Sequence, residues 1–139
     1  MTDSEPIKRD LLLQDIRVYL PKPLRETQNL DGSLVLIGGD PGEVNVEVAE
    51  NHVTVAVFAV VWEGPATPVD RPETIGQFNL KLLPAHQLLT SLHELIDSAC
   101  AIRRSRYRKC EQCGETTPPE WMHDKKTCQR CATLRGVVY

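Results

Sequence analysis

The sequence predicts an α+β fold: an antiparallel sheet of about five strands, one long helix across a face, and a small C-terminal four-cysteine zinc module. Three observations support this prediction. Several short segments alternate apolar and polar residues, as strands with one covered face do. One later segment repeats its apolar residues with the period of a helix. Two Cys-x-x-Cys pairs follow it, near the end of the 139-residue chain.

The predicted sheet extends over about residues 16–82. Its strands are expected at segments 16–20, 34–37, 44–48, 53–62 and 75–82. Segment 44–48 alternates most strictly, with three valines on one face. Segment 53–62 is apolar on both faces for most of its length, which predicts a central strand. The proline-rich segment 64–72 predicts a loop.

A glycine-rich segment, 38–42, lies between two of these strands. It lacks the Gly-Lys-Ser/Thr ending of a phosphate-binding loop, and no helix is expected after it. We therefore interpret it as a turn between strands, where glycine tolerates positive φ.

The long helix is expected over about residues 84–108. Pro84 favours a helix start, because a missing N–H costs nothing in the first turn. The apolar stripe that follows should pack on the sheet. We expect these residues of strand and helix to be buried: Val55, Val57, Phe58, Val60, Leu88, Leu92 and Ile96.

The firmest chemistry lies in Cys110, Cys113, Cys128 and Cys131, with fourteen residues between the pairs. Four thiolates surround one zinc ion tetrahedrally and leave no open position, so we expect one structural Zn²⁺. This spacing is typical of paired Cys-x-x-Cys zinc sites. Two reactive redox pairs are the alternative, but they require a βαβ context that the sequence lacks. His123 lies between the pairs and is a less favoured alternative ligand.

The segment resembles the zinc-ribbon and treble-clef class of small zinc modules. The shared residues are Cys110, Cys113, Gly114, Cys128 and Cys131. The resemblance is to a structural class, and it covers about 22 of the 139 residues. In treble clefs the second pair lies at the start of a helix, and here such a helix would be short. A plain ribbon therefore remains an alternative.

These patterns divide the chain into a body, residues 1–109, and a zinc module, residues 110–139. A module of about 30 residues is too small to build its own core, so the metal should hold it together. The fifth cysteine, Cys100, is expected as a buried, small apolar residue of the long helix.

Charge is distributed unevenly around a net value of −3. Residues 1–100 contain 7 Lys and Arg against 15 Asp and Glu, whereas residues 101–139 contain 9 against 4. Five cations fall within residues 103–109: Arg103, Arg104, Arg106, Arg108 and Lys109. Because like charges repel, we expect carboxylates of the same chain, a second subunit or a polyanion to compensate them.

Two functions fit this pattern. The first is a protein-interaction or adaptor module, in which the zinc module and Trp121 contact a protein partner or a second copy of the chain. The alternative is a nucleic-acid-binding regulator that uses the basic run 103–109, with Tyr107 and Trp121 stacking on bases. We favour the protein-interaction module, because the acidic body would repel phosphates.

The sequence offers little support for an enzyme. His86, His93 and Asp97 share a face of the predicted helix, which is more typical of a solvated surface than of a catalytic site. No serine has a nucleophile signature. We therefore expect no catalytic residues and no small-molecule substrate.

The chain is expected to be cytoplasmic and to have no membrane contact. No apolar run approaches the roughly 18 residues of a membrane span. The polar N-terminal segment lacks the order of a secretion signal. In a reducing compartment, paired cysteines are more typical of metal ligands than of disulfides.

Overall fold

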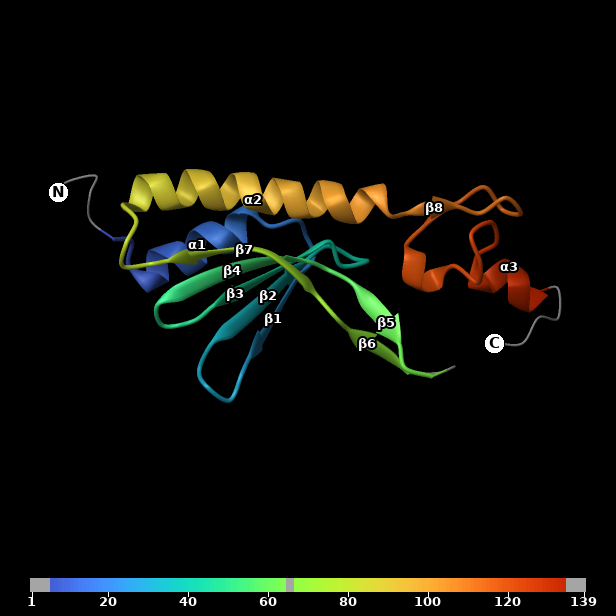
Figure 1. Cartoon of the computed structure of the whole chain (residues 1–139), viewed down its shortest axis with the longest axis horizontal. Coiled ribbons are helices and arrows are strands. Elements are labelled where there is room, and N and C mark those ends of the chain that lie inside the picture. Colours follow the sequence, from blue (N-terminus) through green and yellow to red (C-terminus); the bar gives the residue numbers. More distant parts are fainter. Residues whose placement is uncertain (1–5, 65–66, 135–139) are drawn as a thin grey trace.

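A five-stranded antiparallel sheet forms the centre of the molecule (Figure 1). The computed structural model describes residues 6–64 and 67–134. The strands are β1 (Leu24–Gln28), β2 (Leu34–Gly38), β3 (Val44–Val48), β4 (His52–Val57) and β7 (Glu73–Asn79). They lie in the order β1-β2-β3-β4-β7. The α+β class and the antiparallel sheet of five strands are therefore confirmed.

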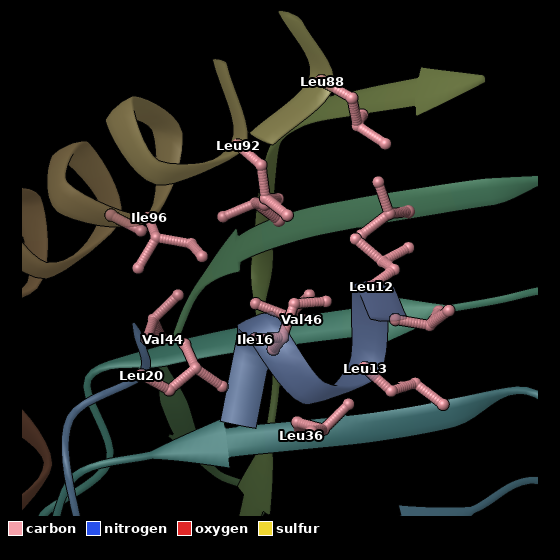
Figure 2. Packing of buried hydrophobic residues seen from close by; sticks show 14 of the residues in the cluster. Leu12, Leu13, Ile16, Leu20, Leu36, Val44, Val46, Leu88, Leu92 and Ile96 are labelled. Carbon is pink, nitrogen blue, oxygen red and sulfur yellow. The ribbon is translucent and has the colours of Figure 1, made fainter. Parts of the chain in front are cut away.

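Two helices cover the same face of this sheet. They are α1 (Arg9–Tyr19) and α2 (Ala85–Ser105). Figure 2 shows side chains of both helices meeting those of Leu36, Val44 and Val46. Across the sheet, Leu36 pairs with Val46 and Val46 pairs with Val55, so the alternating residues of neighbouring strands form one apolar layer. The expected burial holds for Val55, Val57, Phe58, Leu88, Leu92 and Ile96.

The strand predicted at 16–20 is wrong, because residues 16–19 belong to α1 and Leu20 is its C-cap. Leu12, Ile16 and Leu20 are all buried, and their spacing of four places them on one side of a helix. Val18, in contrast, is 78% exposed. A five-residue window showed alternation, whereas the full segment has helical periodicity.

The strand β1 that takes its place in the sheet was missed. Its sequence, LRETQ, has no apolar alternation, and four of its five residues are exposed. An edge strand needs only backbone hydrogen bonds to one neighbour, which leave little trace in side-chain pattern.

The predicted strand 53–62 divides into two elements. β4 ends at Val57, and β5 (Val60–Trp62) pairs with β6 (Pro68–Asp70) in a separate hairpin. β6 lies within the segment expected to be a loop, and Val60 is half-buried rather than buried. The chain leaves the sheet after β4. There the ring of Phe58 packs against Gly42, two residues before β3 begins.

The other boundaries shift by a few residues. α2 ends at Ser105 instead of near 108, and β7 is displaced from the expected 75–82 towards the N-terminus. Leu82, expected on the strand, lies beyond it and is 77% exposed.

The chain beyond α2 forms a small C-terminal module at one end of the sheet (Figure 1). It contains a short hairpin of β8 (Arg108–Lys109) and β9 (Thr116–Thr117), a 3₁₀ turn η1 (Pro119–Trp121), and α3 (Gln129–Leu134).

The helix stripe gives a test of this packing. Leu92 is fully buried between α2 and the sheet, so Leu92→Ala should lower the free energy of unfolding by about 2–5 kcal/mol. Leu82→Ala is the matched control, because Leu82 is largely exposed and should change it by less than about 0.5 kcal/mol. Urea unfolding of both variants measures the difference. Equal effects would contradict the packing described here.

Candidate metal centre

Four cysteine sulfurs meet at one point of the C-terminal module. The sulfur atoms of Cys110, Cys113, Cys128 and Cys131 all lie within 4.8 Å of one another. Four sulfurs placed tetrahedrally at about 2.3 Å from an ion are about 3.8 Å apart. The Cys113 and Cys128 sulfurs are 3.9 Å apart. The four cysteines are therefore positioned to bind one metal ion, and this group contains no histidine.

The first pair lies on a tight turn after β8. The backbone N–H of Gly114 donates to the Cys110 carbonyl at 2.8 Å, which closes the turn around the two sulfurs. Gly114 has φ +75°, a conformation that residues with a Cβ rarely adopt. The Cys110 N–H donates in turn to the Glu115 carbonyl at 3.0 Å. Glycine after the second cysteine is thus required by the turn that aims both thiols at one point.

The second pair lies at the start of α3. Cys128 immediately precedes the helix, Cys131 lies within it, and the N–H of Ala132 donates to the Cys128 carbonyl. The turn before Cys128 is closed by Asp124, whose carboxylate accepts the backbone N–H groups of Lys126 and Thr127 at 2.8 Å each. One helical turn places residues 128 and 131 on the same side, so both sulfurs face the first pair.

The thiols of Cys110 and Cys131 have pKa values shifted in opposite directions. The backbone N–H of Cys128 donates to the Cys110 sulfur at 3.3 Å, and this and neighbouring N–H groups lower the pKa of Cys110 to about 6. Burial, followed by hydrogen bonds with the other ligand sulfurs, raises the pKa of Cys131 to about 12. Four negative sulfurs at this separation repel one another strongly, so a bound cation is what permits full deprotonation.

Arg103 and Glu120 join the C-terminal module to the body. Their side chains are 1% and 3% exposed, and two N–H groups of Arg103 donate to the two carboxylate oxygens of Glu120. Arg103 Nε donates to the Gly42 carbonyl at 2.9 Å. The guanidinium also lies 5.1 Å from the ring centroids of Phe58 and Tyr107. Arg103 therefore has its hydrogen-bond partners and its ring contacts inside the protein.

Sequence reasoning placed Arg103 on a candidate interaction surface, and the structure places it in the interior. It missed Glu120 altogether. An arginine within a run of cations suggests solvent exposure. The neighbouring residues do not show that the carboxylate of Glu120, seventeen residues later, pairs with it. The helical spacing held a usable signal, since Arg103 falls four residues after Ala99 and seven after Ile96, which are both buried.

The other residues of the basic run differ in their surroundings. Arg104 pairs with Glu43, and Arg106 pairs with Glu73 and lowers the pKa of that carboxyl group. Arg108 and Lys109 are exposed on β8, and neither forms an ion pair within residues 6–64 and 67–134. Carboxylates of the same chain thus compensate three of the five cations.

Trp121, the remaining candidate interaction residue, is 47% exposed beside the hairpin β5–β6. Its ring meets that of Trp62 edge-on, with centroids 5.8 Å apart. The indole N–H of Trp62 donates to the Glu120 carbonyl at 2.8 Å. These contacts cross the boundary at residue 110, so the division into units 1–109 and 110–139 stays a prediction.

The histidines of α2 do not form a joint site with Asp97. His93 pairs with Asp15 of α1 at 2.7 Å and stacks on Tyr19, whereas Asp97 accepts the Tyr19 hydroxyl. His86 is exposed. Cys100 is half-buried, which is less than expected, and burial raises the pKa of its thiol to about 11. The contacts of His93 with Asp15 and Tyr19, and of Asp97 with Tyr19, fasten α1 to α2.

Comparisons with known proteins leave the metal centre as the main guide to function. No protein-family model, curated protein or solved structure matches this chain. Within the described part of the chain, no helix combines the length and apolar character needed to cross a bilayer.

The metal centre is tested by its ligands. Cys113→Ser and Cys128→Ser each replace a soft sulfur by a weaker hydroxyl ligand, so each should reduce bound metal to well under one equivalent per chain. Cys100→Ser, outside the cluster, is the control and should retain full metal content. Elemental analysis of the purified chains measures it, and metal-free wild-type protein would contradict the assignment.

The buried ion pair gives a second test. Glu120→Gln leaves the Arg103 guanidinium buried without a counter-charge, which should cost about 3–5 kcal/mol of unfolding free energy. Glu111→Gln changes an exposed carboxylate of the same module and should cost less than about 0.5 kcal/mol. Chemical denaturation of the metal-loaded chains distinguishes them, and similar values would mean that Glu120 does not secure the module.

Proposed function

We propose that this chain is a non-enzymatic protein-interaction module whose C-terminal centre holds one structural zinc ion. One observation carries the proposal: Arg103, Arg104 and Arg106 each bind a carboxylate of the same chain. The basic run therefore offers few free cations to a polyanion. Beside the body, where η1 contacts β5, the module exposes the aromatic ring of Trp121 instead.

The donor set supports zinc and a structural role. A single ion held by four thiolates is typical of zinc or iron, and the pair spacing favours zinc. A site closed by four protein ligands leaves no position for water or substrate, which supports stabilisation rather than catalysis. The second pair lies at the start of α3, so we favour a treble clef over a plain ribbon.

The metal itself weakens the case for nucleic acid. Residues 107–134 contain five Lys and Arg and four Asp and Glu. A Zn²⁺ ion with four thiolates adds a formal charge of about −2. The loaded module is then close to neutral, and a phosphate backbone would gain little from it.

The exposed apolar residues support a protein partner or a second copy of the chain. Val61 of β5 is 48% exposed and Trp121 is 47% exposed. Trp121 belongs to η1, which contacts β5, and Val61 lies in β5. Aromatic residues of this kind are enriched in protein interfaces, where a large ring is buried with little loss of side-chain entropy.

Nucleic-acid binding remains the second candidate because Arg108 and Lys109 are exposed and unpaired in the described chain. A gel-shift assay with mixed DNA and RNA at about 0.15 M salt separates the two functions. We expect no micromolar binding, and no difference between wild type and the double variant Arg108→Glu, Lys109→Glu. Tight binding that this variant abolishes would replace our proposal by the alternative.

Protein contact is tested directly by placing a photocrosslinking residue at position 121 in the producing cells. We expect a discrete protein adduct, of a partner or of a second copy, that is absent when the same residue replaces Leu82, which is more exposed than Trp121. Equal labelling at both positions, or adducts with nucleic acid alone, would count against the proposal.

A further inference from the structure

A cavity of about 230 Å³ lies between the body and the C-terminal module. The end of the sheet contributes Phe58, the hairpin β5–β6 contributes Trp62, and η1 contributes Trp121. Two exposed carboxylates, those of Asp40 and Asp70, also line it. Figure 1 shows the hairpin reaching along the sheet towards the C-terminal module. Segments distant in sequence thus combine aromatic walls with acidic groups.

Several hydrogen-bonding groups of this cavity are already bound or absent. The Trp62 indole N–H is bound to the Glu120 carbonyl, and the linings Pro41 and Pro68 have no backbone N–H. The Glu120 carboxylate is likewise bound, by Arg103. The walls therefore combine aromatic rings with polar groups that are partly bound already, and the Arg25 guanidinium is the charged donor among them.

The charges that remain favour a cation. Asp40, Asp70 and Arg25 line the cavity, and none of the three forms an ion pair within residues 6–64 and 67–134. The Arg25 guanidinium lies 6.0 Å from the Phe58 ring centroid. Two carboxylates against one guanidinium leave a net negative charge beside Trp62 and Trp121, whose rings meet edge-on. Carboxylates and indole faces both attract positive charge.

The volume limits what can enter. Sites for drug-sized ligands enclose roughly 300–1,000 Å³, so this cavity, about 230 Å³, is suited to one side chain rather than to a nucleotide. Lysine and arginine combine an apolar stem with a charged end, which matches an aromatic wall beside carboxylates.

We propose that this cavity binds a lysine or arginine side chain of a protein partner, with its stem against Trp62 and Trp121 and its charge beside Asp40 and Asp70. The proposal rests on the proposed function, since it specifies the chemistry of the partner in that interaction. It also makes the metal centre a condition of recognition, because η1 lies between the two cysteine pairs and supplies one wall.

The test uses the full, zinc-loaded chain and short capped peptides, Gly-Lys-Gly and Gly-Arg-Gly. Trp62 and Trp121 are the chain's two tryptophans, so their indole ¹⁵N–¹H signals report the cavity directly. We expect both signals to shift, with dissociation constants on the order of 1 mM for these minimal probes. Gly-norleucine-Gly keeps the stem without the charge and should bind at least about threefold more weakly.

Variants separate the contributions of wall and charge. Asp70→Asn should weaken lysine-peptide binding about threefold and bring it close to the norleucine value. Asp10→Asn, an exposed carboxylate on α1, is the matched control and should leave it unchanged. Trp121→Ala should remove binding, and circular dichroism with zinc analysis of each sample shows whether the variant has folded.

Three outcomes would overturn the proposal: norleucine binding as tightly as lysine, Gly-Glu-Gly binding more tightly than either, or no indole shift at about 10 mM peptide. Each is distinct from failure of the proposed function. That function fails if the chain lacks zinc or binds nucleic acid, whereas the cavity proposal fails in a metal-loaded chain that still contacts protein elsewhere.

Discussion

The ion pair of Arg103 and Glu120 fixes where the C-terminal module lies against the body. Two charged groups removed from water cost several kcal/mol each in desolvation, and only good geometry offsets that cost. Here both carboxylate oxygens accept guanidinium N–H groups, Gly42 accepts a third, and two aromatic rings flank the guanidinium. Because all of these contacts must form together, the module docks on the body in one position. The main contribution of the ion pair is therefore the specificity of that position.

The metal centre and this ion pair depend on each other. Glu120 lies in the fourteen-residue segment between the two cysteine pairs, and that segment has no core of its own beyond the cysteines and Met122. A metal that ties both pairs together restricts the segment and so restricts Glu120. The ion pair in turn anchors the segment to the end of α2. Folding of the module is therefore coupled to the body through the Glu120 carboxylate, together with the contacts of Trp62 with Glu120 and Trp121.

The same coupling explains the charge pattern of the chain. The acidic body and the basic run meet within the molecule, where Glu43 and Glu73 pair with Arg104 and Arg106. Surface salt bridges contribute little to stability, but they neutralise the positive charge that would attract a polyanion. The charge asymmetry, which marks an interaction surface in many proteins, here mainly describes how the chain folds on itself.

Local pattern determined much of the structure. The alternation at Val44, Val46 and Val48, the helical stripe through Leu88, Leu92 and Ile96, and the two Cys-x-x-Cys pairs each act over a few residues. The strand and the helix depend on the period at which side chains repeat along the backbone, and the four-cysteine cluster depends on the number of metal ligands. All three therefore followed from the sequence.

Tertiary structure decided the features whose partners are distant along the chain and which a short stretch of sequence left open. Ile16 joined a helix because the sheet offered an apolar face for Leu12, Ile16 and Leu20 together. Arg103 became buried because Glu120 neutralises it, and the cavity exists because Trp62 and Trp121 meet across 58 intervening residues. Burial of a charge and closure of a cavity are properties of the assembled fold, since each needs groups from several segments at once.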